Sequence, residues 1–178
     1  MSLTPPVNKN DHIQGEAAAR IELVEYGDFQ CSFCGEAYHI VKSIQNRFGS
    51  DLKFVFRHFP LTEIHHHAKM AAVAAEAAGR QGKFWQMHDM LYENQDELHL
   101  SALRAYAAIL EMDVLKFDED MDDEALFQKV QDDFESGLRS GVHGTPTFYV
   151  NGEKYSLNWD ESSLMSFISN KLEHLPVA

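Results

Sequence analysis

A strand, a helix and a second strand follow one another within about 40 residues near the start of the chain, and this order restricts the fold most. The segment RIELVEY, residues 20–26, is rich in β-forming residues and ends at Gly27. Residues 35–49 repeat apolar side chains at helical spacing and stop at a glycine. Residues 52–59 form a second β-rich run. Such a β-α-β unit pairs its strands in parallel, with a right-handed crossover.

The middle of the chain is helical throughout. Apolar periodicity predicts helices over residues 65–80, 83–94, 101–110 and 124–138, with a short helix over residues 114–117. Alanines line one face of the first of these helices, which lets a neighbouring helix approach closely.

The C-terminal part of the chain returns to strands. Asn151-Gly152 lies between the β-rich runs 147–150 and 153–156, and this dipeptide predicts a hairpin. Residues 160–175 predict a last amphipathic helix that Asp160 caps.

The order β-α-β, helical block, β-β-α predicts an α/β domain that carries an insertion. The first part of that domain covers residues 12–62, including a short partner strand near residues 12–14. The inserted helical domain covers residues 63–140, and the second part of the α/β domain covers residues 141–178.

Composition and charge exclude several classes of partner. The formal net charge of −13 repels phosphate backbones and anionic lipid, so neither nucleic acid nor a membrane is an expected partner. The first 15 residues lack the basic start and apolar run of a signal peptide, which predicts a cytoplasmic protein. A periplasmic or exported protein is expected instead if a signal has been removed. No segment typical of dimerisation is present, so we expect a monomer.

Cys31 and Cys34 are the only cysteines of the chain, and their spacing admits three interpretations. A zinc site needs about four ligands, but the adjacent side chains of His65, His66 and His67 point in different directions and cannot all bind one ion. A structural disulfide that closes so short a loop adds only about 2 kcal/mol and is reduced in a cytoplasm.

The third interpretation is a reactive pair. Cys31 falls between a predicted strand and a predicted helix, where unpaired backbone N–H groups and the helix dipole favour a thiolate. Cys34 lies one turn further into the helix and is expected to be more buried. Cys31 is therefore expected to attack a disulfide, and Cys34 to resolve the mixed disulfide that results.

The chain resembles the DsbA-like thiol-disulfide oxidoreductases, a branch of the thioredoxin superfamily. The resemblance covers nearly the whole chain from about His12 and implies a thioredoxin-like fold with an inserted helical domain. It is carried by the order of the elements and by LVEYGDFQCSFC (23–34), FVFRHFPL (54–61), AAEAAGRQGKFWQMHDMLYENQ (74–95) and GVHGTPTFYVNG (141–152).

The resemblance implies roles for three further residues. Pro146 is expected to follow a cis peptide bond beside the cysteines, and Thr145 to offer its backbone to an extended substrate peptide. Glu25 stands six positions before Cys31, where the superfamily places a buried acid, and there it accepts the proton of Cys34. The residues alone also allow a plain turn at Pro146 and a solvated Glu25.

The dipeptide Ser32-Phe33 departs from the Pro-His of the strongly oxidising members of the family. We expect Ser32 and Phe33 to contact the substrate together with Thr145. Phe33 cannot donate a hydrogen bond to a Cys31 thiolate, and the charges of nearby Asp28 and Glu36 disfavour it. A weakly stabilised thiolate predicts a moderate or reducing potential.

The sequence therefore predicts an enzyme that oxidises, reduces or isomerises protein disulfides. Its substrates are protein or peptide thiols and disulfides, and its electrons pass to or from a thioredoxin or glutathione system. No cofactor is expected beyond the Cys31–Cys34 disulfide itself. Two alternatives stay open: a redox-regulated binding module without turnover, and a glutathione-dependent transferase or isomerase of related fold.

Overall fold

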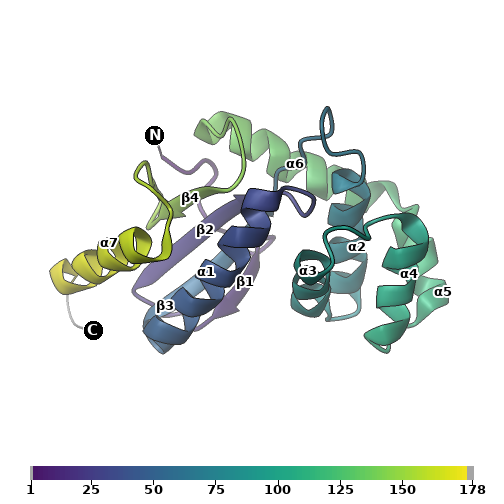
Figure 1. Ribbon diagram of the computed structural model, residues 1–178, viewed down its shortest axis with the longest axis horizontal. Helices are drawn as coiled ribbons and strands as arrows, with labels where there is room; N and C mark the ends of the chain where they lie inside the picture. Colours follow the sequence, from purple (N-terminus) through teal and green to yellow (C-terminus); the bar gives the residue numbers. More distant parts are fainter. Residues whose placement is uncertain (1, 176–178) are drawn as a thin grey trace.

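The computed structural model describes residues 2–175 and builds them around a mixed sheet (Figure 1). Its five strands are β1 (His12–Gly15), β2 (Ile21–Gly27), β3 (Leu52–His58), β4 (Thr147–Val150) and β5 (Glu153–Lys154). They lie in the order β1-β3-β2-β4-β5, with β2 and β3 parallel and the other pairs antiparallel. The predicted parallel β-α-β unit is confirmed.

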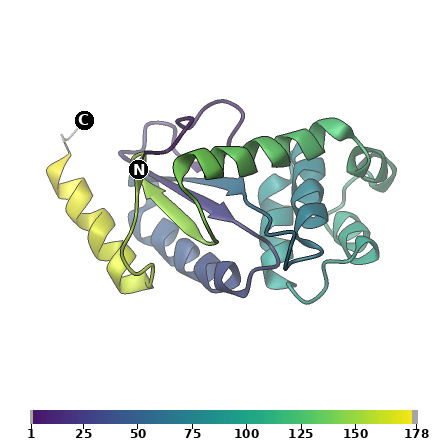
Figure 2. The ribbon, with the colours of Figure 1, turned by 90° about the horizontal axis from the view of Figure 1, so that it is seen from above.

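Helices cover both faces of this sheet. Within the described residues they are α1 (Ser32–Phe48), α2 (Ala68–Arg80), α3 (Phe84–Glu93), α4 (Leu100–Ile109), α5 (Val114–Met121), α6 (Glu124–Ser140) and α7 (Glu161–His174), besides a 3₁₀ turn at Gly49–Asp51. Figure 2 shows α1 and α7 on one face and α6 on the other. The mixed α/β class is confirmed.

The alternation of side chains in β2 divides the core between these two faces. Ile21 and Leu23 join the core beneath α1 and α7. Val24 and Tyr26 point to the opposite face and pack near Phe134 of α6. Glu25 therefore shares the face of Ile21 and Leu23, as the alternation of a strand requires.

Helices α2 to α5 gather beside the sheet, at the right of Figure 1. The alanines of α2 are buried where α2 contacts α3, α5 and α6, so the predicted close approach is confirmed. The helix begins at Ala68 rather than at the predicted His65. The His65 Nδ1 atom instead bonds Asp28 Oδ2 at 2.8 Å, which holds the preceding segment out of the helix.

The C-terminal hairpin and helix also follow the prediction. Asn151 and Gly152 have φ angles of 50° and 78°, the left-handed values that a tight Asn-Gly hairpin turn needs. Asp160 caps α7 by accepting a hydrogen bond from the backbone N–H of Ser163. Strand β5 is shorter than predicted, since it ends at Lys154.

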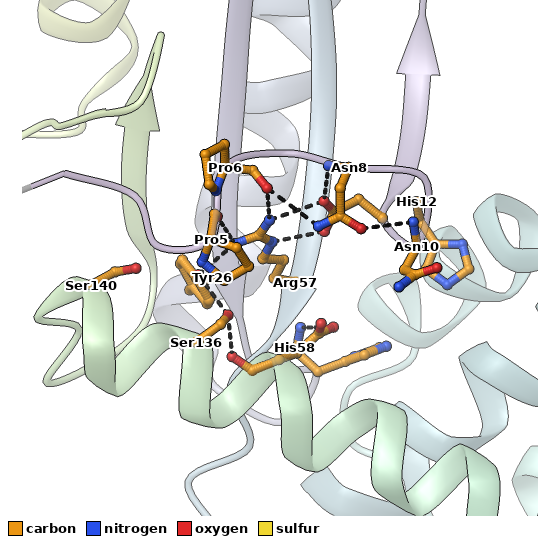
Figure 3. Close-up of polar contacts among 12 residues, drawn as sticks. Pro5, Pro6, Asn8, Asn10, His12, Tyr26, Arg57, His58, Ser136 and Ser140 are labelled. Atoms are coloured by element: carbon orange, nitrogen blue, oxygen red, sulfur yellow. Dashed lines mark hydrogen bonds and ion pairs between the residues drawn. The ribbon is translucent and has the colours of Figure 1, made fainter.

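The segment before β1 is attached to the sheet by a buried arginine of β3. The guanidinium of Arg57 bonds both carboxylate oxygens of Asp11, at 2.7 and 2.9 Å. It also donates to the carbonyl oxygens of Pro5 and Pro6 and to the Tyr26 hydroxyl (Figure 3). The sequence analysis did not identify this network.

Helices α2 to α5 and the turns between them form the helical group. Helix α6 contacts both β3 and α2 and so connects the sheet to this group. The proposed division of the chain at residues 62/63 and 140/141 stays a prediction. No helix within residues 2–175 has the length and apolar character needed to cross a bilayer.

Candidate active site

The Cys31 turn, residues 28–31, links the end of β2 to the start of α1. Cys31 is the N-cap of α1 and has an extended backbone, with φ −74° and ψ 121°. Its N–H donates to the Asp28 carbonyl at 3.1 Å, and its carbonyl accepts from the N–H groups of Cys34 and Gly35. The sequence-based position of Cys31, between a strand and a helix N-terminus, is confirmed.

The two thiols differ in their access to solvent. Cys31 is 6% exposed, whereas Cys34 is fully buried at 0%. The Cys31 Sγ lies 3.5 Å from the carbonyl oxygen of Thr145, which accepts a hydrogen bond only from the protonated form of Cys31. An incoming sulfur can therefore reach Cys31 but not Cys34.

The same asymmetry appears in their proton affinities. The pKa of Cys31 is lowered to about 5, chiefly because the Cys34 thiol donates a hydrogen bond to its sulfur. Burial raises this pKa, whereas the Thr145 side chain and hydrogen bonds from the N–H groups of Cys34 and Phe33 lower it further. Burial, followed by the hydrogen bond to Cys31 and the charge of Glu25, raises the pKa of Cys34 well above its usual value. At neutral pH, Cys31 is a thiolate and Cys34 a thiol.

Asp28 and Glu36, whose charges were expected to disfavour a Cys31 thiolate, are not among the groups that shift the pKa of Cys31. The Asp28 carboxylate points away, since it accepts hydrogen bonds from the N–H groups of Gln30 and Leu61 and from His65. Glu36 is exposed to solvent, which screens its charge.

Glu25 lies within the core, where the alternation of β2 places it. Its side chain is 1% exposed, and its Oε1 atom has no hydrogen-bond partner. Burial first, and then the negative charge of Cys31, raise the pKa of Glu25 to about 8. The residue is therefore mostly protonated at pH 7, and its charge is coupled to both cysteines.

The segment before β4 forms the other wall of the site. The Thr145–Pro146 peptide bond is cis. Thr147, at the start of β4, donates its hydroxyl to the Gly144 carbonyl at 2.7 Å. The structure thus brings Thr145 to Cys31 over a sequence separation of 114 residues.

The two residues between the cysteines face outward. Ser32 is exposed, and among residues 2–175 no hydrogen bond joins its hydroxyl to Cys31. Phe33 is 57% exposed, and its ring meets that of Trp159 edge to face, with 6.4 Å between the centroids. The sequence analysis missed Trp159, because no local pattern links the β5–α7 connection to the Cys31 turn.

One buried cluster has the composition of a metal site. Ligand atoms of His58, Glu76 and Asp133 lie within 4.8 Å of one another. The ammonium group of Lys129 already bonds both oxygens of Asp133 at 2.7 Å, and His12 bonds Glu76. Lys129 thus supplies the positive charge that a metal ion would bring to this cluster. The cluster connects β1, β3, α2 and α6. The three histidines at 65–67 do not converge on one point, since His65 bonds Asp28 while His66 and His67 are exposed.

The chain is similar to part of much longer curated proteins. It is 39% identical over 171 residues to a Na(+)/H(+) antiporter NhaA 1 of Salinispora arenicola, a match that covers 96% of this chain and 26% of the relative. It is 42% identical over 156 residues to NhaA 3 of Salinispora tropica, covering 87% of this chain and 24% of that relative. The chain thus spans about a quarter of these relatives.

Solved structures share the fold over almost the full length of the chain. BdbD from Bacillus subtilis, in its oxidised form, superimposes with a TM-score of 0.83 at 25% identity, covering 94% of this chain and 96% of BdbD. A thioredoxin-like oxidoreductase from Silicibacter pomeroyi gives 0.83 at 21% identity, with 94% and 95% covered. α-DsbA1 from Wolbachia pipientis gives 0.77 at 19% identity, with 94% and 91% covered. The thioredoxin family model matches residues 7–170. With its Cys31–Cys34 pair at the start of α1, the chain belongs to the thioredoxin family, and it shares its fold with α-DsbA1.

Proposed function

We propose that the protein is a thiol-disulfide oxidoreductase that exchanges disulfides with protein substrates through Cys31 and Cys34. The observation that carries this proposal is the unequal pair of thiols. The sulfur that solvent reaches has its pKa lowered to about 5, while the buried one keeps its proton. A metal site or a structural disulfide has no need for this difference.

The reaction proceeds in two balanced steps. The Cys31 thiolate attacks one sulfur of a substrate disulfide; the substrate S–S bond breaks, a mixed disulfide forms, and the other substrate sulfur leaves as a thiolate. Cys34 then loses its proton and attacks the Cys31 sulfur, which releases the second substrate thiolate. Two electrons pass from the protein to the substrate, and oxidation of a substrate dithiol follows the same steps in reverse.

Glu25 is the group that takes the Cys34 proton in this scheme. While Cys31 is a thiolate, its charge helps to hold the Glu25 proton in place. Formation of the mixed disulfide removes that charge, so the pKa of Glu25 falls and its carboxyl releases its own proton to water or to the departing substrate thiolate. The Glu25 carboxylate then accepts the proton of Cys34 as Cys34 attacks.

The surroundings of Cys31 favour an extended polypeptide substrate. The Thr145 backbone faces the Cys31 sulfur and offers hydrogen bonds to a peptide laid beside it, with Pro146 shaping this segment. Phe33 and Trp159 provide an apolar surface next to the sulfur, and Ser32 adds an exposed hydroxyl. When the protein oxidises a substrate, the disulfide form of a thioredoxin or glutathione system accepts the two electrons from the reduced pair; when it reduces a substrate, the thiol form of that system supplies them.

The direction that we propose is oxidation of substrate thiols. A low pKa of Cys31 stabilises the dithiol form and so makes the disulfide more oxidising. The reducing potential expected from Ser32-Phe33 rested on a weakly stabilised thiolate, whereas hydrogen bonds from Cys34 and its neighbours lower the pKa of Cys31.

A redox-regulated binding module is the second candidate function. The observation that favours it is the match to a quarter of much longer antiporters, where such a segment could respond to redox state without turnover. Multiple turnovers on a protein disulfide distinguish the enzyme from the module.

The test measures insulin disulfide reduction with dithiothreitol as the electron source, and oxidation of a reduced dithiol peptide by the protein disulfide. We expect Cys31→Ser to lose all turnover in both assays. Cys34→Ser is expected to accumulate a covalent adduct with the substrate that reductant releases. Wild-type protein alkylated beforehand sets the zero point. Full turnover by Cys31→Ser, or one disulfide consumed per wild-type molecule and no more, would exclude the proposed enzyme.

A further inference from the structure

Gln95, in the turn that follows α3, reaches into the Cys31 turn from the helical group. Its side-chain Nε2 donates to the carbonyl oxygen of Phe29 at 2.8 Å and to that of Cys31 at 2.9 Å. These contacts join residues 66 and 64 positions apart in the sequence. Both N–H bonds of one amide are thus used on the backbone that carries the reactive cysteine.

The geometry of the two bonds fixes the shape of that backbone. The two carbonyls flank Gln30, so a single nitrogen holds the chain where it changes from strand to helix. The Cys31 carbonyl also accepts the first helical hydrogen bonds, from the N–H groups of Cys34 and Gly35. Gln95 therefore contacts the carbonyl group at which the hydrogen bonding of α1 begins.

Gly35 makes room for this contact. A Cβ atom at Gly35 would lie 2.8 Å from the Cδ of Gln95 and still closer to its Oε1 atom. Glycine lowers the stability of a helix relative to alanine. A glycine in the first turn of α1 is explained by the Gln95 amide that occupies the space of a side chain.

Asp28 also holds the turn through hydrogen bonds of its side chain. Its carboxylate accepts from the N–H groups of Gln30 and Leu61, both outside the helical group. Within the described residues, Gln95 is the side chain of the helical group that donates hydrogen bonds to the backbone of this turn.

We propose that Gln95 is a positioning residue for disulfide exchange, which fixes the Cys31 turn through its two amide hydrogen bonds and connects the α3–α4 region to the reactive sulfur. This inference rests on the proposed function of the Cys31–Cys34 pair. Gln95 does not touch the reacting atoms; it holds the backbone so that the N–H groups of Phe33 and Cys34 face the Cys31 sulfur.

The test compares Gln95→Met with Gly35→Ala. Methionine keeps the length of the side chain but cannot donate, whereas the added methyl group of Gly35→Ala leaves Gln95 in the chain and pushes its amide away from the two carbonyls. We expect both variants to raise the pKa of Cys31 by about one unit, measured by thiolate absorbance and by the pH profile of iodoacetamide alkylation. The equilibrium with glutathione is expected to shift about tenfold, or 30 mV, toward a less oxidising disulfide.

Gln81→Met is the matched control. Its amide likewise bridges backbone groups, since it donates to the Asp113 carbonyl at 3.0 Å and accepts from the Asp113 N–H at 2.9 Å. This bridge is remote from the Cys31 turn in sequence and shares no partner with it. We expect Gln81→Met to leave the pKa of Cys31 and the glutathione equilibrium unchanged.

Stability separates positioning from a purely structural role. Gly35→Ala gains helix propensity but loses the two amide hydrogen bonds, so its melting temperature is expected to fall less than that of Gln95→Met, while the pKa of Cys31 rises in both variants. If both variants titrate like the wild type, the inference is wrong, even when substrate turnover proves the proposed function. If the wild type shows no turnover but the pKa shifts appear, the proposed function fails and the positioning role of Gln95 stands.

Discussion

At the scale of single residues, the surroundings of the two cysteines shift their pKa values in opposite directions. Cys31 and Cys34 are three positions apart, yet the pKa of the first is lowered and that of the second is raised. The first lies at a helix N-terminus with donors around its sulfur, and the second lies in the core. Solvation and hydrogen bonding, rather than residue type, decide which sulfur attacks.

Glu25 yields a prediction about stability and pH. Its folded pKa of about 8 exceeds the ordinary value of 4.5, so between these limits the folded protein keeps a proton that the unfolded chain has lost. This contribution to stability is complete below pH 4.5 and is lost as pH rises toward 8. We expect Glu25→Gln to be more stable than the wild type at pH 8 by on the order of 3 kcal/mol, and little different at pH 4.5.

Urea unfolding of the reduced proteins across this pH range measures the difference. Both proteins keep Cys31 and Cys34, so their difference reports the titration of Glu25 together with its coupling to the two thiols. Glu36→Gln, an exposed carboxylate on α1, is the control and should change little at any pH. A stability difference between Glu25→Gln and wild type that stays constant from pH 4.5 to 8 would show that Glu25 titrates normally.

At the scale of elements, buried ionic groups attach segments that the hydrophobic pattern does not connect. The segment before β1 has few apolar residues, but Leu3 is buried and Pro5 and Pro6 bond Arg57. Figure 3 shows the Arg57 side chain enclosed by this segment and by Tyr26. The Arg57–Asp11 pair thus holds the segment on the sheet.

We expect Arg57→Met to destabilise the protein by about 3–5 kcal/mol, because it leaves the buried Asp11 carboxylate without its partner. Denaturant unfolding measures the loss, and hydrogen exchange of residues 2–11 should rise before the rest of the chain. Arg57→Met combined with Asp11→Leu should recover part of the stability, since no buried charge is then left alone.

The surface pair Arg20–Asp51 supplies the control for this prediction. Its side chains are 28% and 44% exposed, and such pairs contribute less than about 1 kcal/mol. Arg20→Met should therefore be close to neutral. Equal losses for Arg20→Met and Arg57→Met would mean that burial of Arg57 adds nothing.

At the scale of the whole molecule, the redox potential of the Cys31–Cys34 pair depends on how much more stable the folded protein is in its dithiol form than in its disulfide form. The environment that stabilises the Cys31 thiolate exists only in the folded dithiol form. We expect the pair to equilibrate with glutathione closer to about −120 mV than to −270 mV, the values typical of a strong oxidant and of a reductant. Alkylation of free thiols in a series of glutathione buffers measures this equilibrium.

The same linkage requires the reduced protein to be more stable than the oxidised one at neutral pH, which parallel denaturation curves can test. A potential of about −120 mV would agree with the expectation of a periplasmic or exported protein. A value near −270 mV would mean that the Cys31 thiolate is not stabilised in this way, and that the expectation drawn from Ser32-Phe33 was sound.

Much of the architecture could be predicted from the sequence because local patterns encode it. Runs of β-forming residues identified β2 and β3, and Asn151-Gly152 predicted the hairpin between β4 and β5. The start of α2 was missed by three residues, because His65 bonds Asp28, a residue 37 positions away. Helix periodicity carries no information about such a distant partner.

The sequence by itself determined the order of strands and helices and the place of Cys31 at a helix N-terminus. These properties depend on side-chain periodicity and on residues that are close in the chain. Only the tertiary structure decided the low pKa of Cys31, the approach of Thr145 and Gln95 to the Cys31 turn, and the burial of Arg57. Solvation and hydrogen bonding depend on every segment that surrounds a group, and those segments meet only when the chain has folded.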